Sequence, residues 1–178
     1  VWGVVYVENM FKEAEASLKD NPLHSIEQIE RIKVAGWIKL WKARALLIKC
    51  EANELIGQVR LEECHTDELV DYYSHRNYHD DNIKAYYYHA LASFNDNKEE
   101  DALYYADKAL KMSLHSDNSI LRGKIEYLRD EILRSLSAEE KNDIIDSLIE
   151  INHILEQKET NNNISLALLL IVLSISIS

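Results

Sequence analysis

The chain has 178 residues, of which 47% are hydrophobic and 29% are charged, a composition typical of one folded domain rather than a disordered chain. With 4 glycines and 1 proline it has too few turn residues for a sheet protein of this length, so helices joined by short polar links are expected. The net charge of −11 argues against nucleic-acid binding by this segment, because phosphates are bound by patches of lysine and arginine.

Two helices are expected near the N-terminus. Apolar residues recur at helical spacing over residues 7–18, and Pro22 ends this first helix. The short apolar run at residues 1–7 is interpreted as the first buried turn of the helix, with the remnant of a signal peptide as the alternative. Ser25 and Gln28 have the spacing of a capping box, which predicts a second, short helix beginning there.

A long helix is predicted over residues 37–56, and Gly57 occupies the position of a C-terminal cap. Residues 62–65 are expected to form a link. Thr66 then begins a further helix, because it is an N-cap residue followed by acids in the first turn. Residues 77–81 are expected to form the next loop.

The clearest pair of helices is predicted over residues 82–94 and 98–114. Only residues 95–97 join them, so the two helices must lie antiparallel as a hairpin. Helices over residues 119–136 and 137–159 continue the series.

This pattern divides the chain into three parts. Residues 1–136 form helical hairpins, residues 137–160 form a C-terminal capping or linker helix, and residues 161–178 form a polar linker and the start of a candidate transmembrane helix. The uncharged run 164–178 reaches about 22 Å as a helix, against about 30 Å for the hydrocarbon core. Because the run is still apolar where it stops, a truncated membrane span is the favoured interpretation, and a buried C-terminal helix or an edge strand is the alternative. The side of the membrane is not assigned, because the flank lacks a lysine or arginine bias.

Residues 85–116, AYYYHALASFNDNKEEDALYYADKALKMSLHS, resemble a tetratricopeptide (TPR) unit. Small residues fall where the two helices touch, at Ala90 and Ala102, and large residues fill the spaces beside them, at Tyr86 and Tyr105. The resemblance implies an all-α fold in which antiparallel helix hairpins stack as a short, TPR-like, right-handed solenoid.

The unit departs from the TPR pattern at three positions. His89 stands where leucine is usual, Ala106 where an aromatic residue is usual, and Leu114 where proline is usual. The resemblance therefore rests on the spacing of small and large residues rather than on a unique motif.

The wider order of segments, over most of residues 13–135, is similar to the N-terminal part of TPR proteins common in Bacteroidetes. In those proteins an array of repeats is followed by a membrane span and sometimes by a cytoplasmic DNA-binding region. The resemblance implies that this chain is a fragment of a membrane-anchored bacterial regulator or scaffold. Its membrane contact would be residues 164–178, at the bacterial inner membrane.

Tyrosines are concentrated in the middle of the chain, and three of them are consecutive at residues 86–88. Neighbouring residues on a helix point about 100° apart, so at least one of the three is expected on an outer or concave surface. In helical-repeat domains the first helix of each hairpin lines the concave groove, and tyrosine suits interfaces because of its apolar body and polar tip. The candidate binding residues are Asn82, Lys84, Tyr87, Tyr88 and His89.

No catalytic motif is found in the sequence. It lacks a GxSxG elbow and a glycine-rich phosphate loop, so an enzyme is not expected, and neither is a cofactor. The densest group of metal-ligand types is interpreted as solvated loop residues, because a loop would break the shared helical face that a metal site needs. That group consists of His75, His79, Asp80, Asp81 and His89.

The two cysteines, Cys50 and Cys64, are too few for a disulfide framework. They are interpreted as small, semi-buried residues. A single bridge between them is the alternative, conceivable in an oxidising compartment.

Together these features predict a protein- or peptide-binding helical-repeat scaffold, the sensing or interaction part of a membrane-anchored regulatory protein. The alternative is a structural segment that self-associates into homo-oligomers through residues 138–158. A helical enzyme or metal protein that uses the histidine cluster is the third hypothesis.

Overall fold

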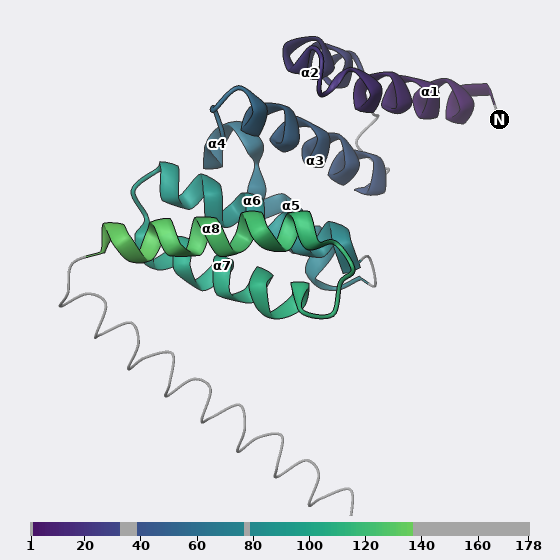
Figure 1. The fold of residues 1–178 in the computed structure, drawn as a ribbon. Helices are drawn as coiled ribbons and strands as arrows, with labels where there is room; N and C mark the ends of the chain where they lie inside the picture. Colours follow the sequence, from purple (N-terminus) through teal and green to yellow (C-terminus); the bar gives the residue numbers. More distant parts are fainter. Residues whose placement is uncertain (1, 33–38, 77–78, 137–178) are drawn as a thin grey trace, which may run out of the picture. The chain divides into compact units, whose positions relative to one another are not determined.

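The computed structural model describes residues 2–32, 39–76 and 79–136. These residues form eight helices and no strand (Figure 1), so the described part of the chain is all-α, as the sequence predicts. The helices are α1 (Trp2–Ser17), α2 (Pro22–Arg31), α3 (Lys39–Leu55), α4 (Leu61–Cys64), α5 (Thr66–Ser74), α6 (His79–Asn95), α7 (Glu99–Ser113) and α8 (Ser119–Ser135).

The chain separates into two compact units, Val1–Ser135 and Leu136–Ser178. The predicted capping or linker helix 137–160 and the predicted linker and membrane segment 161–178 lie outside the described residues. Within the described ranges, no helix has the length and apolar character needed to cross a membrane.

The start of α2 differs from the prediction. Asn21 is the N-cap, and its side-chain oxygen accepts a hydrogen bond from the backbone N–H of His24 at 3.1 Å. Pro22 occupies the first turn, where its fixed φ suits a helix and its missing N–H costs nothing. The predicted capping box at Ser25 is therefore wrong: Ser25 is buried inside α2, and its hydroxyl donates to the carbonyl of Ala14 at 2.8 Å.

The end of α3 confirms the predicted cap at Gly57. Gly57 has a φ of +72°, in the left-handed region that favours glycine. Its N–H donates to the carbonyl of Glu54 at 3.1 Å, and the N–H of Gln58 donates to the carbonyl of Asn53 at 2.8 Å. This pair of hydrogen bonds is a Schellman motif, and it satisfies two carbonyls that the helix end leaves open.

The segment between α3 and α6 is more helical than predicted. The expected link at 62–65 is wrong, because Leu61–Cys64 forms the one-turn helix α4. His65, with a φ of 45°, is the left-handed residue between α4 and α5, so it takes the N-cap position expected for Thr66. The expected loop at 77–81 is wrong in its last part, because α6 begins at His79 and its acids stand in the first turn, where they stabilise the exposed N–H groups.

The predicted hairpin over residues 82–114 is confirmed as α6 and α7. Residues 96–98 connect the two helices, which pack along each other. Asn97 has a φ of 55°, and the N–H of Lys98 donates to the carbonyl of Ser93 at 2.9 Å. Asparagine thus has the role here that Gly57 has after α3, since it tolerates left-handed backbone better than most residues. The predicted helix 119–136 is confirmed as α8.

Helix α6 is the centre of this unit. It packs against α3, α4, α5, α7 and α8, and ten of its residues are buried. Ala90 on α6 and Ala102 on α7 are both fully buried, and such small side chains allow the backbones of two helices to approach closely. A second group of buried side chains holds α1, α2 and α3 together. Its members are Phe11, Ala14, Leu18, Ile29, Ile32, Ile48 and Ala52.

Candidate functional site

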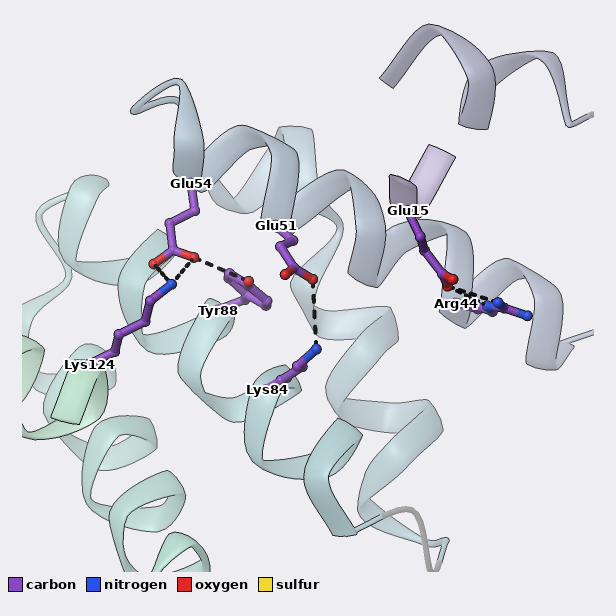
Figure 2. A network of polar contacts seen from close by, with 7 residues as sticks. All are labelled: Glu15, Arg44, Glu51, Glu54, Lys84, Tyr88 and Lys124. Carbon is purple, nitrogen blue, oxygen red and sulfur yellow. Dashed lines mark hydrogen bonds and ion pairs between the residues drawn. The ribbon is translucent and has the colours of Figure 1, made fainter. Parts of the chain in front are cut away.

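A carboxylate on α3 binds polar groups from two other helices. Glu54 accepts a hydrogen bond from the Tyr87 hydroxyl at 2.6 Å and one from the Tyr88 hydroxyl at 3.2 Å. The ammonium group of Lys124 on α8 donates to both oxygens of the same carboxylate, at 3.0 and 2.9 Å. Figure 2 shows Tyr88 and Lys124 converging on Glu54 from α6 and α8. We call these four residues the Glu54 cluster.

The carboxylate at the centre of the Glu54 cluster is mostly shielded from water. The Glu54 side chain is 17% exposed, whereas Lys124 is 45% exposed, so water screens the ion pair more than the phenol contacts. Burial raises the pKa of Tyr87 and of Tyr88 far above its ordinary value, and the negative charge of Glu54 raises both further. Both phenols therefore stay protonated and act as donors. The arrangement joins three helices, α3, α6 and α8.

Three further ion pairs join α3 to its neighbours, and Figure 2 shows two of them, Lys84–Glu51 and Arg44–Glu15. Lys84 on α6 lies 3.7 Å from Glu51, one turn before Glu54. At the other end of α3, Arg44 pairs with Glu8 and with Glu15 of α1, each at 2.8 Å. Helix α3 thus has polar contacts with helices that precede and follow it in the chain.

The expectation that at least one of Tyr86–Tyr88 lies on an outer or concave surface is wrong. Their exposed fractions are 3%, 5% and 3%. The reason is that helices pack around α6 on several sides, so a step of about 100° between neighbours still points each ring into protein. Tyr86 stacks on Tyr105 with ring centroids 6.0 Å apart, while Tyr87 and Tyr88 turn toward Glu54.

The predicted binding residues are all on α6 but do not form one exposed surface. Asn82 and His89 are buried with Tyr87 and Tyr88, whereas the Lys84 side chain is 33% exposed. Direct contact between these residues and a ligand stays a prediction.

His89 is enclosed by α5 and α7. Its Nδ1 lies 3.5 Å from a carboxylate oxygen of Asp67, and its ring centroid lies 4.0 Å from that of Tyr105. Burial lowers the pKa of His89, and the charges of Asp67 and Asp101 only partly oppose this effect. The imidazole is therefore neutral in the folded chain near pH 7.

The histidines and acids weighed as a metal site do not gather. His75 is the C-cap of α5, His79 begins α6, and His89 is buried further along that helix. Asp80 instead accepts a hydrogen bond from the Ser116 hydroxyl at 2.8 Å. Among the residues that the structure describes, no three ligand-type side chains are arranged to hold a metal ion.

An open pocket of about 250 Å³ lies between α3 and α5. Its polar lining includes cations on α3 and carboxylates on α5, and its apolar lining comes from both helices. The lining residues are Lys39, Lys42, Ala43, Leu46, Glu68, Asp71 and Tyr72. The sequence does not indicate this α3–α5 pocket, because its charged residues lie on two separate predicted helices and have the pattern of solvent-exposed helix faces.

The chain matches no family model, no curated protein and no solved structure. Its function is therefore inferred from the geometry of its own residues.

Replacing Glu54 by alanine is expected to destabilise the fold by about 2 kcal/mol, because two buried phenol hydroxyls lose their acceptor. Glu126→Ala, at an exposed position on α8, is the matched control and should change the free energy of unfolding by less than about 0.5 kcal/mol. Urea unfolding measures both. Equal unfolding midpoints for the two variants would show that the Glu54 cluster does not stabilise the fold.

The free energy of unfolding is expected to fall as the pH drops below about 6.5, the pKa of an unfolded histidine. The unfolded chain binds a proton at His89 there, whereas burial lowers the pKa of His89 in the folded chain. The slope from this one group is at most about 1.4 kcal/mol per pH unit. Urea unfolding at several pH values should give a flatter profile for His89→Gln than for the unmodified chain. His115→Gln, at an exposed site, is the matched control.

Proposed function

We propose that this chain is a helical-repeat scaffold that binds another protein or a peptide, and that the α3–α5 pocket receives one of the partner's side chains. The observation that carries the proposal is the pocket's composition: apolar Ala43 and Leu46 beside the ring of Tyr72, with charges of both signs around them. An apolar floor with a polar rim is typical of a side-chain pocket at a protein interface.

The volume of the pocket favours a peptide over a cofactor. Sites for small molecules usually measure about 300–1,000 Å³ and enclose most of the ligand. At about 250 Å³, and open to solvent, the α3–α5 pocket suits one or two side chains of a longer ligand. Lys42 and Glu68 pair with each other, so Lys39 would pair with an acid of the partner and Asp71 with one of its basic residues.

The TPR-like solenoid is part of this proposal. Three features support it: α5, α6, α7 and α8 pack in chain order, residues 96–98 make a tight turn, and Ala90 and Ala102 are buried where α6 and α7 meet. In such arrays each repeat contacts mainly its neighbours, and the exposed faces bind extended partners.

The residues of α6 have different roles in this proposal. Lys84 is the one of the five predicted binding residues that is partly exposed, so it is the candidate for direct contact. Tyr87 and Tyr88 hold α6 against α3 and α8 through Glu54.

We also propose that the scaffold is anchored to a bacterial inner membrane through residues 164–178 and serves a regulatory protein. The uncharged, apolar character of that stretch supports this assignment. No catalytic role is part of the proposal.

Peptides selected from a displayed library on the full chain are expected to bind about tenfold more weakly to Lys39→Glu or Asp71→Lys, because each change reverses a charge at the pocket rim. Lys111→Glu on α7 and Asp130→Lys on α8 carry the same changes at exposed positions outside the pocket and should bind normally. Isothermal titration measures the affinities. Unchanged binding by both rim variants, or failure to select any peptide, would contradict the proposed pocket.

Self-association is the second candidate function, and one observation favours it. Ile120 and Tyr127 on α8 are 78% and 66% exposed, and their spacing of seven residues puts them on the same helix face. The predicted interface 138–158 lies outside the described residues.

If this exposed face of α8 joins two copies, sedimentation should show a dimer whose dissociation constant rises at least about tenfold in Tyr127→Glu. Glu126→Lys, at the adjacent exposed position, should not weaken it comparably. A monomer at high concentration would exclude this candidate and leave the peptide-binding proposal intact.

A further inference from the structure

The thiol of Cys50 contacts the backbone of Cys64, although the two residues lie on different helices. Cys50 is on α3 and Cys64 ends α4, and neither is exposed. The Cys50 thiol donates to the backbone carbonyl of Cys64, with the sulfur 3.6 Å from the oxygen. The turn at Gly57 brings α4 back against α3, which explains how residues 14 positions apart share one buried site. Both are free thiols.

The surroundings of the two sulfur atoms make them chemically different. Cys64 Sγ accepts a hydrogen bond from the side-chain amide of Asn53 at 3.5 Å. The neighbouring Cys50 thiol lowers the pKa of Cys64 to about 7, with a further contribution from Asn53 and against the effect of burial. Burial raises the pKa of Cys50 well above its ordinary value. Near neutral pH Cys64 is therefore partly ionised to the thiolate, whereas Cys50 stays a thiol.

We propose that Cys50 and Cys64 are a redox-active pair, which a peroxide oxidises to an intramolecular disulfide that fixes α4 to α3. The inference is independent of peptide binding. It rests on three observations: both cysteines are fully buried, the Cys50 thiol contacts the backbone carbonyl of Cys64, and the Asn53 amide donates to the Cys64 sulfur.

The reaction balances with hydrogen peroxide as the oxidant. The Cys64 thiolate attacks one peroxide oxygen, the O–O bond breaks, and Cys64 becomes a sulfenic acid while hydroxide leaves. That hydroxide takes the proton of Cys50 and becomes water. The Cys50 sulfur then attacks the Cys64 sulfur, the S–O bond breaks, and the second oxygen leaves as hydroxide. That hydroxide takes up the proton released when Cys64 ionised, so two thiols and one peroxide give one disulfide and two waters.

The proposed bond would affect more than α3. At the start of α4 the backbone N–H of Leu61 donates to Asp96, and the Arg60 side chain pairs with the same carboxylate, both at 2.9 Å. Asp96 lies in the turn between α6 and α7. A disulfide at Cys64 would therefore hold α4 at its second end, with α3 on one side and the α6–α7 turn on the other.

The test treats the full chain with hydrogen peroxide under native conditions, blocks remaining thiols, and maps peptides by mass spectrometry. We expect a linked Cys50–Cys64 peptide from monomeric protein, its loss on reduction, and a thermal midpoint several degrees higher before reduction than after. Thiols that stay unmodified until the chain is unfolded, or a link between two chains, would overturn the proposal.

Single-cysteine variants test the order of events. In Cys50→Ser, Cys64 should accumulate as a sulfenic acid that dimedone traps, whereas in Cys64→Ser the remaining Cys50 should react at least about tenfold more slowly, as expected for a thiol with a raised pKa. Equal trapping in the two variants would overturn the assignment of Cys64 as the attacking residue.

The pH profile of the unmodified chain keeps the test decisive if a variant does not fold. Because the pKa of Cys64 is about 7, the rate of disulfide formation should rise about tenfold from pH 6 to pH 8 and then level off. A rate that keeps rising steeply above pH 8 would indicate an ordinary thiol and contradict the proposal.

Discussion

The burial of α6 on several sides is the constraint on which the rest of the structure depends. A helix that packs against five others buries the polar groups that its side chains carry, and α6 brings two tyrosine hydroxyls inside the protein. A buried hydroxyl without a partner costs about 1–3 kcal/mol, so the fold needs an acceptor at that place. Glu54 supplies it from α3, and Lys124 compensates the carboxylate from α8. The buried hydroxyls of α6 thereby require a carboxylate on α3, and that carboxylate is compensated by a lysine on α8.

Most helices could be predicted from the sequence, because the spacing of apolar residues reports a buried face whatever covers it. The caps were less predictable, since several residues compete for each helix start. Helix α2 begins at Asn21 and Pro22, because asparagine is a good N-cap and proline fits the first turn. Ser25 is therefore free to donate its hydroxyl to the carbonyl of Ala14. The left-handed conformation of His65 could not be predicted from the sequence, because few residues other than glycine and asparagine indicate that conformation.

The candidate site was less predictable than the fold, because it depends on which helices meet. The spacing of the three consecutive tyrosines shows correctly that they point in different directions, but not that protein lies in each of them. Likewise, the α3–α5 pocket combines Lys39 with Asp71, residues whose proximity follows from packing alone. The cysteines are the intermediate case: their number in the sequence excludes a disulfide framework, but only the structure shows that the Cys50 thiol contacts the backbone of Cys64.

The pairing of Lys124 with Glu54 joins residues 70 positions apart, and this has a consequence for how the protein is made. Synthesis proceeds from the N-terminus, so α3 and α6 leave the ribosome before α8 exists. Until then the carboxylate faces the two tyrosines without its counter-charge. The Glu54 cluster can be completed only after translation has passed residue 124. The docking of α8 is therefore the last step in assembling this cluster in the nascent chain.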